Sequence, residues 1–446
     1  MRIVVAGAGN VGFHICKLLA HEGQDIVLID LDADKLKYAS EHLDVSTILG
    51  SSTSNSVLEE ANVASADLMI AVTSSEEINI TTSIFAKHLG AKKTVARISN
   101  IEFLLNREKP DLKKLGIDEI ISPESLAAKE VKRLLREAAL TDTFDFEEGK
   151  LSLIGISIDN NSLLKDKTLK ETAHLNPDQN FITVAILRNN ETIIPYGNNK
   201  FQVNDHAYFI AQPDGVERVI NLCGKKKVAI RNIMIMGGSR VAYNVARRLG
   251  KRYNIKLIEQ DKERSFRLAD QLPDILVING DGRDIELLKE EGIQHMDAFI
   301  AVTGNSETNI FSCLVAKNHG VAKTIALVEN MDYIHLSQSI GVDTMINKKL
   351  IAANFVFRYI RQGQVLSLTS IHGVDAEVLE FEVQENSKIT QKVLKKMDFP
   401  KTAIIGGVIR NGVGYSTTGD FKFQPKDRVV VLCKPESIHK VESFFK

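Results

Sequence analysis

The chain has 446 residues, of which 44% are hydrophobic and 25% are charged, and its formal net charge is -1. Single hydrophobic cores rarely exceed ~250–300 residues, so this length predicts more than one domain. A chain with a net charge near zero offers no sign of the basic surface that nucleic-acid binding needs, so no nucleic-acid partner is expected. No apolar run reaches the ~18–20 residues that cross a bilayer, and the N-terminus runs straight into a predicted strand. We therefore expect neither a membrane-spanning nor a secreted protein.

The first thirty residues carry a dinucleotide-binding pattern. A short apolar run at 3–6 predicts a buried parallel strand, and it leads into Gly7-Ala8-Gly9-Asn10-Val11-Gly12 and then into helical spacing. In such a motif the second glycine lets the backbone approach a pyrophosphate, which binds at the helix N-terminus. A second predicted strand ends in Asp30, where a carboxylate can accept hydrogen bonds from a ribose hydroxyl and would repel the extra phosphate of NADP. The pattern favours NAD over NADP, although a Rossmann shell that binds nothing is the alternative.

The same unit occurs twice. Residues 67–80 match residues 297–310 at eight of fourteen positions with one constant offset, and Gly50 falls opposite Gly280. A self-match of this length at one offset indicates an internal duplication. Each copy is expected to form a six-stranded β-α unit.

Each predicted unit is followed by a segment with different patterning. Strands are expected at 151–158 and 181–187 around a helix at 163–170, with counterparts at 378–383, 403–409 and 389–396. Two short motifs also recur, Arg188-Asn189 as Arg410-Asn411 and Phe201-x-x-x-Asp205 as Phe423-x-x-x-Asp427.

The expected fold class is α/β, with two tandem Rossmann-like, doubly wound parallel sheets, each followed by a small α+β module. The predicted boundaries are 1–138 and 228–362 for the nucleotide-binding units, and 139–225 and 363–446 for the small modules.

No residue can be nominated for catalysis. A dehydrogenase needs a proton-transfer group beside the nicotinamide and a domain that positions substrate, and the 11 histidines show no triad or ligand spacing. The four cysteines are widely separated, which favours buried free thiols and argues against a zinc site. An NAD-dependent oxidoreductase remains the alternative to a non-enzymatic nucleotide sensor. A redox-sensing transcriptional regulator would need a basic winged-helix segment, which we do not find.

The glycine motif, Asp30, the 67–79 block, Ala96-Arg97-Ile98 and the trailing small module together resemble an RCK (also called KTN) domain with its C-terminal subdomain. Two such domains in one chain are similar to the family of Trk potassium uptake system regulatory proteins, and the resemblance covers essentially the whole chain. It implies a cytoplasmic protein, peripheral on the inner face of the membrane, that binds nucleotides. It also implies a homo-oligomeric gating ring, a dimer or tetramer of tandem chains, beneath a separate potassium-translocating membrane subunit.

The resemblance implies roles in a first site for NAD or NADH. The backbone would hold the diphosphate, and a carboxylate would hold the ribose. Two loops would line the adenine and ribose edges, and an arginine would approach the phosphates. The residues are Gly7, Ala8, Gly9, Asn10, Val11, Asp30, Ser51, Ser52, Thr53, Val72, Thr73 and Arg97. For Arg97 the alternative is a salt bridge at a strand end, and for Glu77 and Asn79 it is capping of a helix without ligand contact.

The second copy departs from the motif. Ser239 replaces the close-approach glycine, so its Cβ is expected to crowd a pyrophosphate, and Leu327 stands opposite Arg97. Glu259 retains the ribose-binding carboxylate and Arg240 adds a charge. The expected ligand is NAD, ATP or ADP, bound more weakly or in another pose, and an empty structural copy is the alternative. The candidate residues are Gly237, Gly238, Ser239, Arg240, Val241, Glu259, Gly280, Asp281 and Thr303.

A helix is expected after Ser122-Pro123, because the serine can cap it and proline suits its first turn. By the family resemblance this helix crosses to a partner unit, and packing within its own unit is the alternative. Its apolar positions are Leu126, Ala127, Val131, Leu134 and Leu135.

Overall fold

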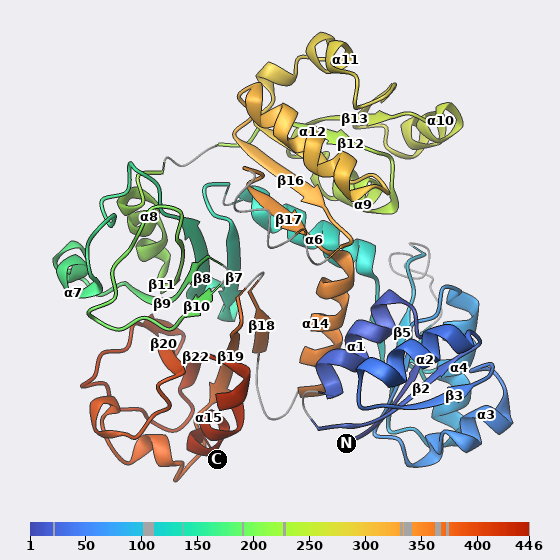
Figure 1. The fold of residues 1–446 in the computed structure, drawn as a ribbon, viewed down its shortest axis with the longest axis horizontal. Helices are drawn as coiled ribbons and strands as arrows, with labels where there is room; N and C mark the ends of the chain where they lie inside the picture. The colour runs from blue at the N-terminus through green and yellow to red at the C-terminus, as the bar shows by residue number, and fades with distance from the viewer. Residues whose placement is uncertain are drawn as a thin grey trace. The chain divides into compact units, whose positions relative to one another are not determined.

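The computed structural model describes residues 1–20, 23–100, 111–136, 138–189, 191–225, 229–330, 333, 341–361, 367–371 and 374–445. Within these residues the chain forms four sheets (Figure 1). Two are six-stranded and parallel, and two are five-stranded. The predicted fold class is confirmed.

The first parallel sheet has the strand order β3-β2-β1-β4-β5-β6. Its strands are β1 (Arg2–Ala6), β2 (Asp25–Asp30), β3 (Ser46–Leu49), β4 (Leu68–Ala71), β5 (Lys93–Arg97) and β6 (Glu119–Ile121). Its helices are α1 (Asn10–Ala20), α2 (Ala33–His42), α3 (Asn55–Glu60), α4 (Glu76–Leu89) and α6 (Pro123–Arg136). The central strands form because nearly every residue is apolar and buried on both faces, as the four buried residues of β1 show.

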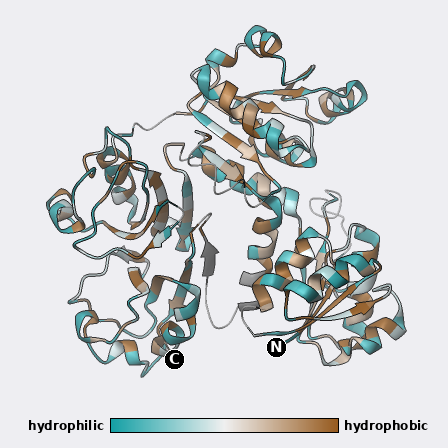
Figure 2. Ribbon diagram, viewed as in Figure 1, coloured by the Kyte–Doolittle hydropathy of each residue, from teal (hydrophilic) through white to brown (hydrophobic). Residues whose placement is uncertain are grey.

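The second parallel sheet repeats this order as β14-β13-β12-β15-β16-β17. Its strands are β12 (Asn232–Met236), β13 (Asn254–Glu259), β14 (Leu276–Asn279), β15 (Ala298–Ala301), β16 (Lys323–Leu327) and β17 (Thr344–Ile346). Its helices are α9 (Arg240–Leu249), α10 (Lys262–Gln271), α11 (Ile285–Glu290) and α12 (Ser306–Asn318), and α14 (Lys348–Arg361) follows β17 in the chain. The helices beside both sheets alternate between hydrophilic and hydrophobic residues, as expected for helices with one buried face (Figure 2).

Each small module is an antiparallel sheet with short helices. The first contains β7 (Asp142–Phe146), β8 (Leu151–Ser157), β9 (Phe181–Arg188), β10 (Glu191–Ile193), β11 (His206–Ala211), α7 (Leu169–Thr172) and α8 (Pro213–Leu222). The second contains β18 (Ser367–Ser370), β19 (Glu377–Glu382), β20 (Ala403–Arg410), β21 (Val413–Tyr415), β22 (Arg428–Cys433) and α15 (Ile438–Phe445). The two modules share a core in which Leu153, Val184 and Ile210 pack with Val378 and Leu432.

The predicted helix of each small module was wrong in extent. In the first module only the four-residue α7 at Leu169–Thr172 is α-helical, and it starts at a Thr168 capping box. In the second module the segment forms two 3₁₀ turns, Lys388–Thr390 and Leu394–Lys396. Apolar residues at helical spacing also suit a segment of turns that buries occasional side chains, so periodicity alone did not separate the two.

The repeated Arg-Asn and Phe-x-x-x-Asp motifs meet in space. The Arg188 guanidinium donates from Nε and Nη2 to the two oxygens of Asp205, both at 2.7 Å. Arg410 makes the same fork with Asp427, at 2.7 Å for each bond. Both aspartates are buried, and a bidentate pair satisfies their charge in place of water. The motifs are thus structural, since each fixes one hairpin against the loop that follows it.

The chain divides into two compact units, and the division cuts across the two sequence repeats. One unit comprises Met1–Ala128 with Asn347–Ile360, and the other Lys129–Ile346 with Arg361–Lys446. Most of α14 therefore groups with the first sheet, where Lys93 Nζ lies 5.2 Å from the centroid of the Tyr359 ring. The predicted helix after Ser122-Pro123 is α6, and it belongs partly to each unit.

Candidate functional site

The first candidate site lies at the topological switch point of the first sheet, where successive strands stop being added on one side of β1 and begin to be added on the other. In the observed strand order, β1 and β4 are neighbours, and their carboxyl ends carry Gly7 and Val72-Thr73. Ligands of open α/β sheets bind in the crevice at such a switch point. Gly7 has φ of +109°, and a Cβ there would lie 2.9 Å from Thr73 N, so the glycine brings the two loops together.

A side chain at each of the three motif glycines would meet different surroundings. A Cβ on Gly12 would lie 1.8 Å from the Gly7 carbonyl oxygen, so α1 can approach β1 only with glycine there. A Cβ on Gly9 would meet no atom within 4 Å. Nothing in the surrounding protein requires glycine at position 9, and the space beside it is compatible with an external group. Ala8 and Val11 are buried, so they can offer a ligand only backbone atoms.

The Asp30 carboxylate is held at the end of β2 by two backbone amides. Its Oδ2 accepts from Ala8 N at 2.5 Å, and its Oδ1 accepts from Asp32 N at 2.9 Å. A carboxylate offers about four lone-pair sites, so these bonds leave acceptor capacity for a ribose hydroxyl. The same bonds fix the carboxylate beside the glycine loop.

The loop after β3 differs from the expectation in one respect. The Ser52 side chain is buried, and its hydroxyl bonds Thr82 Oγ1 at 2.8 Å. Its hydroxyl is therefore directed into the protein, so Ser52 can offer a ligand only backbone atoms. Ser51 and Thr53 are partly exposed and bond each other at 2.8 Å through their hydroxyls.

Arg97, at the end of β5, is paired with an acidic residue. One of its terminal nitrogens lies 3.6 Å from a carboxylate oxygen of Glu124, and the Arg97 side chain is 27% exposed. The other Glu124 oxygen accepts from Ser99 Oγ at 2.7 Å. The salt bridge that was the alternative interpretation of Arg97 is present, and the partial exposure still leaves the guanidinium accessible.

Glu77 and Asn79 differ in their roles at the start of α4. Ser75 is the N-cap residue, since its hydroxyl accepts from Ile78 N, and Glu77 accepts from that hydroxyl at 2.6 Å. This hydrogen bond lowers the pKa of Glu77. Asn79 does not cap the helix. It is fully buried and bonds Thr73 and Arg97 instead.

The second copy forms a defined cleft of about 350 Å³. Glu259 repeats the arrangement of Asp30, because its carboxylate accepts from Gly238 N at 2.6 Å and from Asp261 N at 2.7 Å. The cleft is lined by the glycine loop, the ends of the neighbouring strands and the loops that follow them. Lining residues include Gly237, Gly238, Ser239, Glu259, Asp281 and Thr303.

Ser239 is the N-cap residue of α9, the helix that begins at this cleft. Its hydroxyl oxygen accepts from Ala242 N at 3.3 Å and thereby caps α9. Gly9 stands at the equivalent position and has no side chain with which to cap α1. Val241 is buried, whereas Arg240 is exposed at the first position of the helix. The first-turn amides that could meet an anion are therefore differently available in the two copies.

Two arginines that the sequence did not single out line the second cleft. Arg264 Nη1 lies 3.8 Å from Glu259 Oε2, and Arg283 forms a fork on Asp281 with its closest contact at 2.6 Å. The Arg283 hydrogen bond lowers the pKa of Asp281. The equivalents of these arginines in the first copy are Lys35 and Thr53. A comparison of the two copies at equivalent positions could have found them.

Family comparison covers most of the chain. The TrkA-N domain matches residues 3–123 and 233–348, and the TrkA-C domain matches residues 153–224 and 378–446. The chain belongs to the TrkA family. The matched ranges cover both parallel sheets and most of both small modules, and the resemblance predicted from the sequence is confirmed.

Relatives align over the full length of the chain. The Trk system potassium uptake protein TrkA homolog 1 of Methanosarcina mazei is 34% identical, with complete coverage of both chains. The TrkA of Azorhizobium caulinodans is 32% identical over 100% of this chain and 99% of its own. These TrkA relatives carry the names of potassium uptake proteins and not of enzymes, in agreement with the non-enzymatic expectation.

Solved structures share the fold at low sequence identity. The GsuK RCK domain superposes with a TM-score of 0.61 at 15% identity, covering 99% of this TrkA-family chain and 94% of its own. The GsuK channel bound to NAD gives the same TM-score and identity, with 100% and 78% coverage. Within the part of the chain that the structure describes, no helix is long and apolar enough to cross a membrane.

Proposed function

We propose that this chain binds NAD or NADH in its first cleft and uses that binding to regulate a separate potassium-translocating membrane subunit. Family membership supports the role in potassium uptake, and the NAD-bound GsuK channel supports the ligand by analogy of fold. The observation that carries the ligand assignment is the open space at Gly9 beside the fixed Asp30 carboxylate. A diphosphate would lie against the backbone of Gly7 to Val11, and Asp30 would accept from the adenosine ribose.

The other predicted contacts of the first cleft keep their places in this proposal, with Ser52 contributing backbone only. Ser51, Thr53, Val72 and Thr73 would border the adenine and ribose, and Arg97 would turn from Glu124 toward the phosphates. A guanidinium suits that task because it stays charged and can form two parallel hydrogen bonds.

The second cleft would take an adenine nucleotide of a different kind or pose, with NAD, ATP and ADP as candidates. The capping contact of Ser239 and the paired arginines near Glu259 and Asp281 distinguish it from the first cleft. Retention of the buried, amide-held Glu259 supports a ribose contact there.

Regulation requires assembly with the membrane subunit. The chain would lie in the cytoplasm on the inner face of the membrane, as a homo-oligomeric ring of two or four tandem chains. Nucleotide would favour one ring shape over another by its differential affinity, and typical couplings are ~1–3 kcal/mol.

Calorimetric titration of the purified chain with NAD, NADH, ATP and ADP tests the proposal. Asp30→Ala should weaken NAD binding about 10- to 100-fold, since hydrogen bonds to a charged group contribute roughly 1.5–3 kcal/mol. Glu259→Ala should spare that site and affect only heat from the second cleft. Equal NAD affinity in unmodified and Asp30→Ala protein would contradict the assignment. Nucleotide-dependent potassium flux through the reconstituted membrane subunit, lost in Asp30→Ala, tests the regulatory step.

A further inference from the structure

Asn79 lies in the first turn of α4 and is completely buried. Its Oδ1 accepts from Thr73 N at 2.8 Å and from Thr73 Oγ1 at 2.7 Å. Its Nδ2 donates to the Thr73 carbonyl at 3.2 Å and to the Arg97 carbonyl at 3.0 Å. One side chain therefore joins the end of β4 to the end of β5.

The chemistry of this link requires an amide. The backbone N–H of Thr73 can only donate and the two carbonyls can only accept, which fixes the orientation of the Asn79 amide. All four of its hydrogen-bonding positions are used. Aspartate would turn an acceptor toward two carbonyls, and alanine would leave the buried groups unpaired, which is costly in a low-dielectric interior.

The two residues that Asn79 joins border the proposed NAD cleft from different strands. Thr73 follows β4 at the switch point, and Arg97 carries the guanidinium expected at the phosphates. The Thr73 hydroxyl proton is directed to Asn79 and to the Ser75 carbonyl, at 2.7 and 3.1 Å. Toward a ligand, the Thr73 hydroxyl is thus left to act as an acceptor.

We infer that Asn79 is a positioning residue for the nucleotide: without touching the ligand, it fixes the spacing between Thr73 and the backbone of Arg97. The inference rests on the proposed function of the first cleft. It assigns to a buried residue a contribution to affinity that acts through Thr73 and Arg97.

The second copy provides a matched control within the same chain. Asn309 makes the same four bonds, accepting from Thr303 N and Oγ1 at 3.0 and 2.6 Å and donating to the carbonyls of Thr303 and Leu327 at 3.1 and 2.8 Å. The set of hydrogen bonds is equivalent, but the second strand that it joins carries the uncharged Leu327 in place of Arg97. Replacing Asn309 removes the same contacts without disturbing the first cleft.

The experiment compares NAD affinity and thermal stability of Asn79→Ala, Asn309→Ala and unmodified protein. Asn79→Ala should weaken NAD binding at the first cleft about tenfold, because the cleft loses the constraint on both of its sides. Asn309→Ala should lower stability to a similar degree and leave first-cleft affinity within about twofold. Asn79→Ser is measured alongside, so that the comparison does not depend on the alanine variant folding.

A double-mutant cycle with Arg97→Ala separates positioning from a general loss of structure. If Asn79 acts through Arg97, the Arg97→Ala substitution should weaken NAD binding less in the Asn79→Ala background than in unmodified protein. If the two substitutions have independent effects on NAD binding, or if Asn79→Ala leaves NAD affinity unchanged, the inference about Asn79 is overturned while the proposed function stands. Failure of the unmodified chain to bind NAD would contradict the proposed function as well.

Discussion

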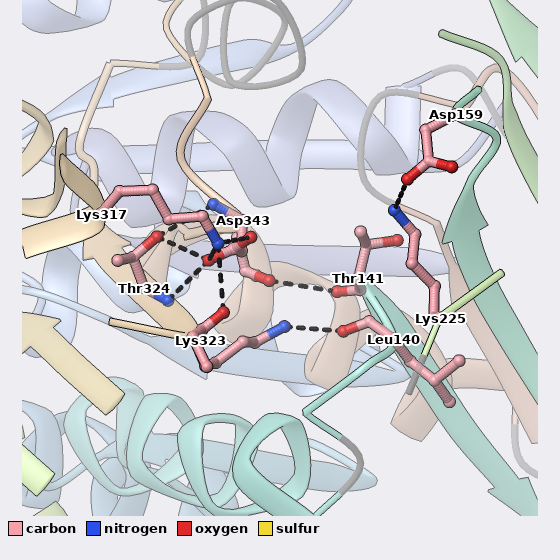
Figure 3. A network of polar contacts seen from close by, with 10 residues as sticks. Leu140, Thr141, Asp159, Lys225, Lys317, Lys323, Thr324 and Asp343 are labelled. Atoms are coloured by element: carbon pink, nitrogen blue, oxygen red, sulfur yellow. Dashed lines mark hydrogen bonds and ion pairs between the residues drawn. The ribbon is translucent and has the colours of Figure 1, made fainter. Parts of the chain in front are cut away.

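At the scale of single residues, one buried charge distinguishes the two copies. Lys323, in β16, is 1% exposed, and its Nζ donates to the Leu140 carbonyl at 2.6 Å (Figure 3). Thr344 Oγ1 reaches the next carbonyl, that of Thr141, at 3.4 Å. Together they fasten the segment before β7 to the second sheet. The equivalent Lys93 is exposed and lies against an aromatic ring.

Burial lowers the pKa of Lys323 to about 8, and the charge of Lys317 acts in the same direction, while Asp343 and Asp142 oppose it. Above pH 8 the folded chain has released this proton, whereas the unfolded chain keeps it until about pH 10.5. The unfolded state binds more protons in this window, so the contribution of Lys323 makes the folded state more stable as pH rises.

We therefore predict a pH-dependent difference between unmodified protein and Lys323→Met, measured by urea unfolding. The unfolding free energy of the unmodified protein relative to the variant should rise by about 1 kcal/mol between pH 7.5 and 9. Burial raises the pKa of Cys16, Cys223 and Cys313 and acts in the opposite direction at higher pH, but these thiols are common to both proteins. Lys93→Met is the control and should show no such trend. A flat difference for Lys323→Met would mean that Lys323 keeps an ordinary pKa.

At the scale of elements, the sequence was informative where burial and special backbone geometry coincide. The parallel strands were predictable because their apolar runs are buried on both faces, and the first turn of each sheet because Gly7 and Gly237 have positive φ. The Asp30 and Glu259 positions were predictable from their spacing to those turns. The inward rotation of Ser52 and the Asn79 link were not, since both depend on partners 18 to 30 residues away.

Helices α6 and α14 belong to units that the sequence repeats did not reveal. The first-sheet unit contains Asn347–Ile360 from the second half, and the other unit contains Lys129–Arg136 of α6. Leu134 and Leu135 of α6 are buried within the single chain. Charged substitutions there would damage the fold of the chain itself, so loss of oligomers in such variants would not identify an intermolecular contact.

A division of the chain tests this arrangement more cleanly. Fragments 1–225 and 229–446 should copurify when produced together, because each unit takes residues from both. Each fragment alone should be less stable, since it lacks residues that its unit uses. A fragment 1–225 that is as stable alone as in the mixture, and elutes separately from its complement, would contradict the shared units.

At the scale of the whole molecule, duplication has preserved the frame and changed the chemistry of the cleft. Strand order, the amide-held carboxylate and the buried asparagine are the same in both copies. The two copies differ at the helix N-terminus and at the end of the fifth strand, where Gly9 and Arg97 correspond to Ser239 and Leu327. Divergence of this kind is expected of two clefts that share a fold and differ in ligand.

The most direct test of this account is a titration of NAD into chains in which the two motif residues are exchanged. Gly9→Ser adds a side chain where no atom lies within 4 Å, so stability should be preserved while the first cleft loses about tenfold or more in NAD affinity. Ser239→Gly removes the cap of α9 at a cost of a few tenths of a kcal/mol and should improve NAD binding in the second cleft. NAD affinity that is unchanged by Gly9→Ser in a folded protein would contradict the claim that the first glycine loop is the dinucleotide site.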